Sequence, residues 1–86
     1  LPDIDNLIAN PGSYMPSEDP AVLYALTGAV ASRAEQSKLD NIMKLAGKIP
    51  VEFQVVLVKS ILALNRTLFQ QPTIQTWVQK NADVVL

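Results

Sequence analysis

Residues 51–64 read VEFQVVLVKSILAL and form the most apolar run in the chain. The only charged residues in this run are Glu52 and Lys59. Its apolar side chains cover nearly the whole circumference of a helical wheel, and a helix that is apolar on every side belongs inside a protein. The sequence therefore predicts a central helix over residues 51–64, with shorter helices packed around it.

Two further helices are predicted on the N-terminal side of this run. Apolar side chains at helical spacing in residues 4–8 predict a short helix of two turns within the first ten residues. The sequence Ser-Glu-Asp-Pro at residues 17–20 is a typical helix start. Ser17 or Asp19 can accept hydrogen bonds from the first free amides, and Pro20 has no amide to leave unsatisfied. This second helix should reach about residue 33.

Two more helices are predicted around the central one. Residues 35–46 have a clean amphipathic pattern, and Gly47 is expected to end that helix in the left-handed conformation. Pro50 then begins the central helix, so the connection is tight. The last helix is expected over residues 73–85, and Trp77 lies in its apolar stripe, which favours a core position over an exposed binding anchor.

Two local features call for packing explanations. Residues 10–16 contain two prolines and a glycine, so they predict an irregular strap that carries Tyr14 and Met15 across the next helix. Gly28 lies inside a predicted helix, where glycine costs about 1 kcal/mol relative to alanine. Close approach of a neighbouring helix at Gly28 is the expected compensation.

No segment alternates with period two, so the expected fold class is all-α. We expect a compact bundle of four main helices plus a short N-terminal helix, which forms a single helical domain over residues 1–86. Apolar residues make up 49% of the chain and charged residues only 17%, against about 25% charged in an average soluble domain. This composition indicates that another part of a longer chain, or an oligomer, covers part of the surface. The chain begins with Leu1, which fits a fragment cut from a larger protein, although processing would give the same start.

Composition also argues against several functions. The net charge is −1, which gives no basic footprint for nucleic acid, and the helix after the Gly47 turn is too apolar to read base edges. The chain has no His and no Cys, so the usual general base, the thiolate nucleophile and the common zinc ligands are absent. The longest apolar run is too short to cross a membrane, and no signal peptide is recognisable. We expect a cytoplasmic protein that binds neither nucleic acid nor membrane.

No catalytic, cofactor or metal site is expected within the chain. The eight acidic residues are scattered, mostly near helix starts, where carboxylates act as caps. A phosphate-binding loop of the form GxxxxGK[ST] is absent. The candidates for interaction are the two arginines, Arg33 and Arg66, which both fall near predicted helix ends. Either they cap terminal carbonyls at the negative end of a helix dipole, or they are offered to a neighbouring domain or a phosphate.

Three stretches carry a family resemblance. They read DPAVLYALTGAVASRA, KIPVEFQVVLVKSIL and TIQTWVQKNADVVL, and together they cover most of the chain from about Asp19 onward. They resemble the C-terminal helical part of MoxR-type AAA+ ATPases, including phage-borne members. Position 49 is Ile where the family pattern has Leu. The matching positions are Leu23, Tyr24, Ala25, Leu26, Arg33, Ala34, Pro50, Glu52, Phe53, Val56, Trp77, Ala82, Asp83 and Val84.

This resemblance implies a non-catalytic helical domain that follows a P-loop ATPase core. The domain would serve subunit contact, lid motion or partner recognition in ATP-driven remodelling of protein complexes. Its partners would be the ATPase core of its own chain, in a hexameric ring, and an unknown protein client. ATP and magnesium are implied for the parent chain and not for these residues, because no nucleotide-binding motif maps onto them. The alternative is a free-standing helical adaptor that binds a partner through an exposed apolar patch.

Overall fold

The computed structural model describes residues 3–85, and within them it contains helices and turns but no strand. The four main helices and the short N-terminal helix are all present, which confirms the predicted fold class. Three short 3₁₀ turns join them, and a final single turn follows. The elements in chain order are α1 (Ile4–Ala9), η1 (Pro11–Ser13), α2 (Pro20–Ala31), η2 (Gln36–Lys38), α3 (Leu39–Ala46), α4 (Val51–Leu64), η3 (Arg66–Gln70), α5 (Pro72–Lys80) and α6 (Ala82–Val85).

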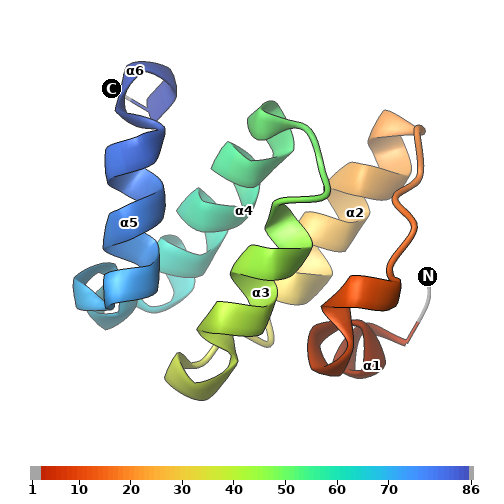
Figure 1. The fold of residues 1–86 in the computed structure, drawn as a ribbon, viewed down its shortest axis with the longest axis horizontal. Coiled ribbons are helices and arrows are strands. Elements are labelled where there is room, and N and C mark those ends of the chain that lie inside the picture. Colours follow the sequence, from red (N-terminus) through yellow and green to blue (C-terminus); the bar gives the residue numbers. More distant parts are fainter. Residues whose placement is uncertain (1–2, 86) are drawn as a thin grey trace.

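The helices are arranged around α3 (Figure 1). Helices α2 and α4 lie side by side, run in the same direction and make the most extensive contact between two helices. Helix α3 runs in the opposite direction and lies in front of this pair in Figure 1, while α1 and α5 flank it on either side. Of the helices in residues 3–85, α4 is the longest at 14 residues, and none is long and apolar enough to cross a bilayer.

Side-chain caps fix several of the helix starts, as the sequence predicts. The Asp19 Oδ1 accepts a hydrogen bond from the Ala21 amide at 2.9 Å, and Pro20 is the first residue of α2. Ser17 supports this cap, since its Oγ accepts from the Asp19 amide at 3.0 Å. Asp3 caps α1 in the same way, by accepting from the Asn6 amide at 3.2 Å. These bonds satisfy amides that the helices themselves leave free.

Helix α3 occupies the middle of the core. Four of its eight residues, Leu39, Ile42, Leu45 and Ala46, are almost fully buried. Buried side chains from every neighbouring element pack in one cluster with them. The other members of this cluster are Ile4, Leu7, Ile8, Tyr14, Leu23, Leu26, Val30, Ala31, Ile49, Leu57, Ile61, Leu68 and Ile74.

Helix α4 is not enclosed on all sides within this chain, so the prediction of a fully central helix is wrong. Its buried residues are Leu57, Val58 and Ile61, while Val56 is only partly buried and Leu64 is 67% exposed. The shorter α3 buries a larger share of its residues, four of eight, against three of the fourteen in α4. Composition alone does not say whether an apolar helix is covered by its own chain.

Several boundaries and one glycine conformation differ from the prediction. Helix α2 ends at Ala31, and the expected helix over 35–46 begins as a 3₁₀ turn. Gly47 has φ of −61° and is right-handed. The turn needs no left-handed residue, because the amides of Lys48 and Ile49 bond to carbonyls in the last turn of α3 at 3.0 and 3.1 Å. The last helix is interrupted at Asn81, which separates α5 from α6.

The strap and Gly28 also differ from their predicted surroundings. The strap lies on α3 instead of on α2, with Tyr14 buried and Met15 85% exposed. Lys48 holds the strap, because its Nζ donates to the carbonyls of Gly12 and Tyr14 at 2.7 and 2.9 Å. No neighbouring helix approaches Gly28, where a Cβ would meet nothing within 4 Å. The expected close approach is therefore absent within the described residues.

Candidate functional site

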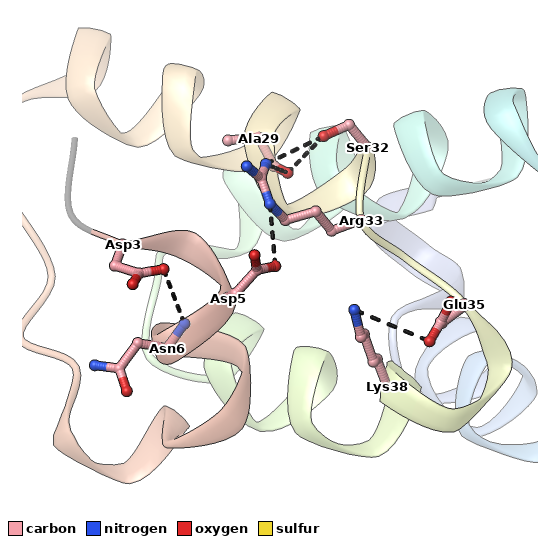
Figure 2. A network of polar contacts seen from close by, with 8 residues as sticks. All are labelled: Asp3, Asp5, Asn6, Ala29, Ser32, Arg33, Glu35 and Lys38. Carbon is pink, nitrogen blue, oxygen red and sulfur yellow. Dashed lines mark hydrogen bonds and ion pairs between the residues drawn. The ribbon is translucent and has the colours of Figure 1, made fainter.

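Arg33 is committed to contacts within the fold (Figure 2). Its guanidinium donates to the Ala29 carbonyl at 3.0 Å, in the last turn of α2, and approaches the Ser32 Oγ at 3.5 Å. Its Nε also pairs with the Asp5 Oδ1 at 3.2 Å, so the side chain joins the end of α2 to α1. Both side chains of this pair are well exposed, so the pair contributes only about 0.2 to 1 kcal/mol. The bond to the Ala29 carbonyl is the kind of contact that the capping interpretation of Arg33 expects.

Arg66 has different surroundings. It begins η3, at the end of the bundle where both α2 and α4 finish, and it lines a shallow hollow of about 320 Å³ together with Leu62 and Phe69. Among residues 3–85, no side chain forms an ion pair with the Arg66 guanidinium. The structure does not bring Arg33 and Arg66 into contact. Of the two arginines, Arg66 is the one without an ion pair within the described residues.

Several carboxylates stabilise the fold through hydrogen bonds or an ion pair. Asp3 and Asp19 cap helices, Asp5 pairs with Arg33, and Asp40 accepts a hydrogen bond from the Thr73 hydroxyl. No group of three potential metal-ligating side chains converges in the part of the chain that the structure describes. Buried polar side chains in residues 3–85 all have hydrogen-bond partners. These contacts account for several of the carboxylates without assigning them any chemistry.

The outward surface of α2 is apolar and carries no charge. The sequence of the helix, PAVLYALTGAVA, contains no charged side chain. Thr27 is buried, and its hydroxyl donates to the Tyr24 carbonyl at 2.7 Å. A helix surface that faces water normally carries charged residues. On α2 it carries Tyr24 instead, which is 64% exposed. We call this surface the α2 outer face, and its exposed members are Ala21, Val22, Tyr24, Ala25 and Gly28.

A groove of about 640 Å³ lies on another part of the molecule, between α3, the start of α4 and α5. Trp77 forms its floor and is only 8% exposed, which confirms the predicted packing of this side chain in the fold. The indole Nε1 donates to the Gln54 Oε1 at 2.9 Å, and the Gln54 Nε2 donates to the Ile49 carbonyl at 3.0 Å. These two bonds fix the floor and satisfy its polar atoms.

Sequence reasoning did not find this groove. One signal was available, because Gln54 is a polar residue within the most apolar run and a partly buried amide needs hydrogen-bond partners. The chain has a single Trp, whose N–H also needs a partner when it is buried. The two residues are 23 positions apart, so the sequence gives no direct indication that they meet.

Comparisons of this chain with family models, with curated proteins and with solved structures find no match.

Proposed function

We propose that this chain is the non-catalytic helical C-terminal domain of a MoxR-type AAA+ ATPase, and that it acts through contact with protein. Its roles would be subunit contact, lid motion or partner recognition during ATP-driven remodelling. ATP and magnesium would then be bound by a P-loop core elsewhere in the parent chain. The observation that carries the proposal is the α2 outer face, which is apolar and uncharged although it is exposed.

The residues of the family resemblance support the proposal by where they lie. Leu23, Leu26 and Trp77 are buried, and the packing of this domain explains them. Tyr24 and Val84 are 64% and 53% exposed, so the packing of the described residues gives no reason for large apolar side chains at these positions. Contact with a further protein surface would bury them, and burial of such side chains is the main favourable term in association.

A helical adaptor that works alone is the second candidate. It would use the same α2 outer face, and it differs only in lacking an ATPase core. The coding sequence that precedes Leu1 separates the two proposals. The ATPase proposal expects a strand followed by GxxxxGK[ST], and then a second strand that ends in an acidic metal ligand. If the reading frame instead opens near Leu1, the ATPase proposal fails and the adaptor proposal stands.

The α2 outer face can be tested directly in the full-length product. We expect Tyr24→Lys to reduce ATP turnover and ring assembly, measured by phosphate release and by light scattering after size exclusion. Met15→Lys is the matched control, because Met15 is even more exposed and lies on the strap instead of on α2. The proposal requires that Met15→Lys has no effect on either measurement. Equal effects of the two substitutions, or none from Tyr24→Lys, would contradict it. Turnover of ATP by the 86 residues alone would also contradict it.

A further inference from the structure

The groove between α3, α4 and α5 has the features of a preformed binding site. Its volume of about 640 Å³ falls within the range of about 300 to 1,000 Å³ that is typical of ligand pockets. Apolar side chains of Met43, Val51 and Trp77 line it, and each comes from a different helix. The groove contains no residue of α2, so it is distinct from the α2 outer face.

Two side-chain hydrogen bonds join the helices that form the groove. The bond from Trp77 to Gln54 joins α5 to α4. At the other wall, the Thr73 hydroxyl donates to the Asp40 carboxylate and joins α5 to α3. Both bonds add to the packing of α5 on its neighbours, in which the Ile74 side chain is fully buried. The walls of the groove are therefore in place before a ligand binds, which reduces the entropy lost on binding.

The charge of the lining points to the chemistry of the occupant. Among residues 3–85, Lys80 is the only charged residue that lines the groove, and no carboxylate of these residues lines it. Thr76 lies one helical turn before Lys80 on α5 and also lines the groove, so a hydroxyl and an ammonium group stand on the same wall. In residues 3–85, no ion pair engages the Lys80 ammonium. A carboxylate in the groove would accept hydrogen bonds from both groups.

We propose that this groove binds a short acidic peptide segment of a partner protein. An aliphatic or aromatic side chain of the segment packs on Trp77 between Met43 and Val51, and a nearby Glu or Asp side chain pairs with Lys80. This inference goes beyond the ATPase proposal and does not depend on it, because a free-standing adaptor would use the groove in the same way. Its test needs only the 86-residue chain, so it can succeed or fail independently of the ATPase proposal.

The single Trp gives a direct readout, since its fluorescence reports on the floor of the groove alone. The probe is a set of acetylated and amidated hexapeptides that contain one Leu or Phe and one Glu at varied spacing. A matched set has Lys in place of Glu. We expect saturable changes in Trp77 emission with several Glu peptides and weaker or no changes with the Lys peptides. The absence of saturable change with every Glu peptide would overturn the proposal.

Three variants locate the binding. Lys80→Glu should reverse the preference, so that Lys peptides bind better than Glu peptides. Lys80→Ala should weaken Glu peptides by about 2- to 5-fold, as is typical of an exposed ion pair. Val51→Arg should abolish binding by filling the groove, while circular dichroism shows the helices intact. Lys59→Glu is the control, because Lys59 is exposed on α4 and does not line the groove.

Each remaining outcome is decisive. If Lys59→Glu changes peptide preference as much as Lys80→Glu, the effect is general electrostatics and the proposal is wrong. Binding that survives Val51→Arg would place the peptide elsewhere. The same hexapeptides made with a free C-terminal carboxylate complete the test: if they bind and the amidated Glu peptides do not, the groove recognises chain ends instead of acidic side chains, which overturns the stated occupant.

Discussion

Helices α2 and α3 bury their inner surfaces equally well but differ on their outer surfaces. In α3, Leu39, Ile42 and Leu45 are nearly inaccessible to solvent, while Asp40 and Lys44 are exposed. This is the ordinary pattern of an amphipathic helix at a boundary between core and water. Burial within this chain and contact with water therefore account for these five residues of α3.

Burial within this chain explains only one of the two faces of α2. Leu23, Leu26 and Val30 are as well buried as the core residues of α3, so α2 is firmly anchored on one side. Its other side has no charged residue, although the described residues leave it exposed. Burial within this chain therefore explains the apolar residues on the inner face of α2 but not those on its outer face. The α2 outer face fits a surface that another protein surface covers.

The largest expected effect tests whether the two inner surfaces are equivalent. Ile42→Ala in α3 and Leu26→Ala in α2 should each reduce the free energy of unfolding by about 2 to 5 kcal/mol, because each leaves a cavity in the core. A domain of this length has a total of only about 4 to 13 kcal/mol, so either variant will be close to unfolding. Urea denaturation followed by circular dichroism measures both. A loss below about 1 kcal/mol for Leu26→Ala would contradict the equivalence of the two inner surfaces, because α2 would then be weakly anchored.

A smaller effect distinguishes the starts of the two helices. Asp19 caps α2, whereas α3 follows a 3₁₀ turn and has no side-chain cap. Asp19→Ala should cost about 1 kcal/mol, since the Ala21 amide loses its acceptor. Asp19→Asn retains an acceptor and is the matched control. Equal losses in the two variants, measured by thermal denaturation, would mean that the carboxylate charge matters more than the hydrogen bond.

Features that depend on neighbouring residues in the sequence were predictable. The Asp19 cap, the four main helices and the stripe containing Trp77 all follow from spacing and from the chemistry of helix ends. The positions of Arg33 and Arg66 near predicted helix ends also gave two interpretations, the capping of terminal carbonyls and contact with a neighbouring domain or a phosphate. The contacts of Arg33 with Asp5 and the Ala29 carbonyl could not be predicted, because they depend on how α1 packs against the end of α2.

Features that depend on packing were not predictable. The apolar run over 51–64 indicates burial, but the sequence does not say that the shorter α3 buries a larger share of its residues. Gly47 satisfies its turn with ordinary right-handed geometry, so the residue type alone was a poor guide to its conformation. The groove escaped prediction for the same reason, since its floor depends on Gln54 meeting Trp77 from another helix.

A substitution at Gly28 tests whether the exposed surface of α2 has a close neighbour within this chain. It lies inside α2 with no positive φ, and an added Cβ would meet no atom within 4 Å. Gly28→Ala should therefore stabilise this chain by about 0.5 to 1 kcal/mol, because alanine loses less conformational entropy in a helix. Ala25→Gly, on the same exposed surface, is the reciprocal control and should destabilise by a similar amount. Urea denaturation of the two variants would contradict this account if Gly28→Ala proved destabilising, since α2 would then have a close neighbour within the chain.

The smallest expected effect on stability carries the most information about the α2 outer face. Tyr24→Lys should change the free energy of unfolding by no more than about 0.5 kcal/mol, which is the usual range for an exposed substitution. Lys44→Ala, on the exposed side of α3, should be equally mild and serves as the control. Urea denaturation of both variants provides the measurement. A loss above about 1 kcal/mol for Tyr24→Lys alone would mean that the Tyr24 ring already packs within this chain. The α2 outer face would then need no partner, and the difference between α2 and α3 would disappear. If both variants are neutral, the ring contributes nothing measurable to this fold, as the proposed contact of the α2 outer face with another protein surface requires.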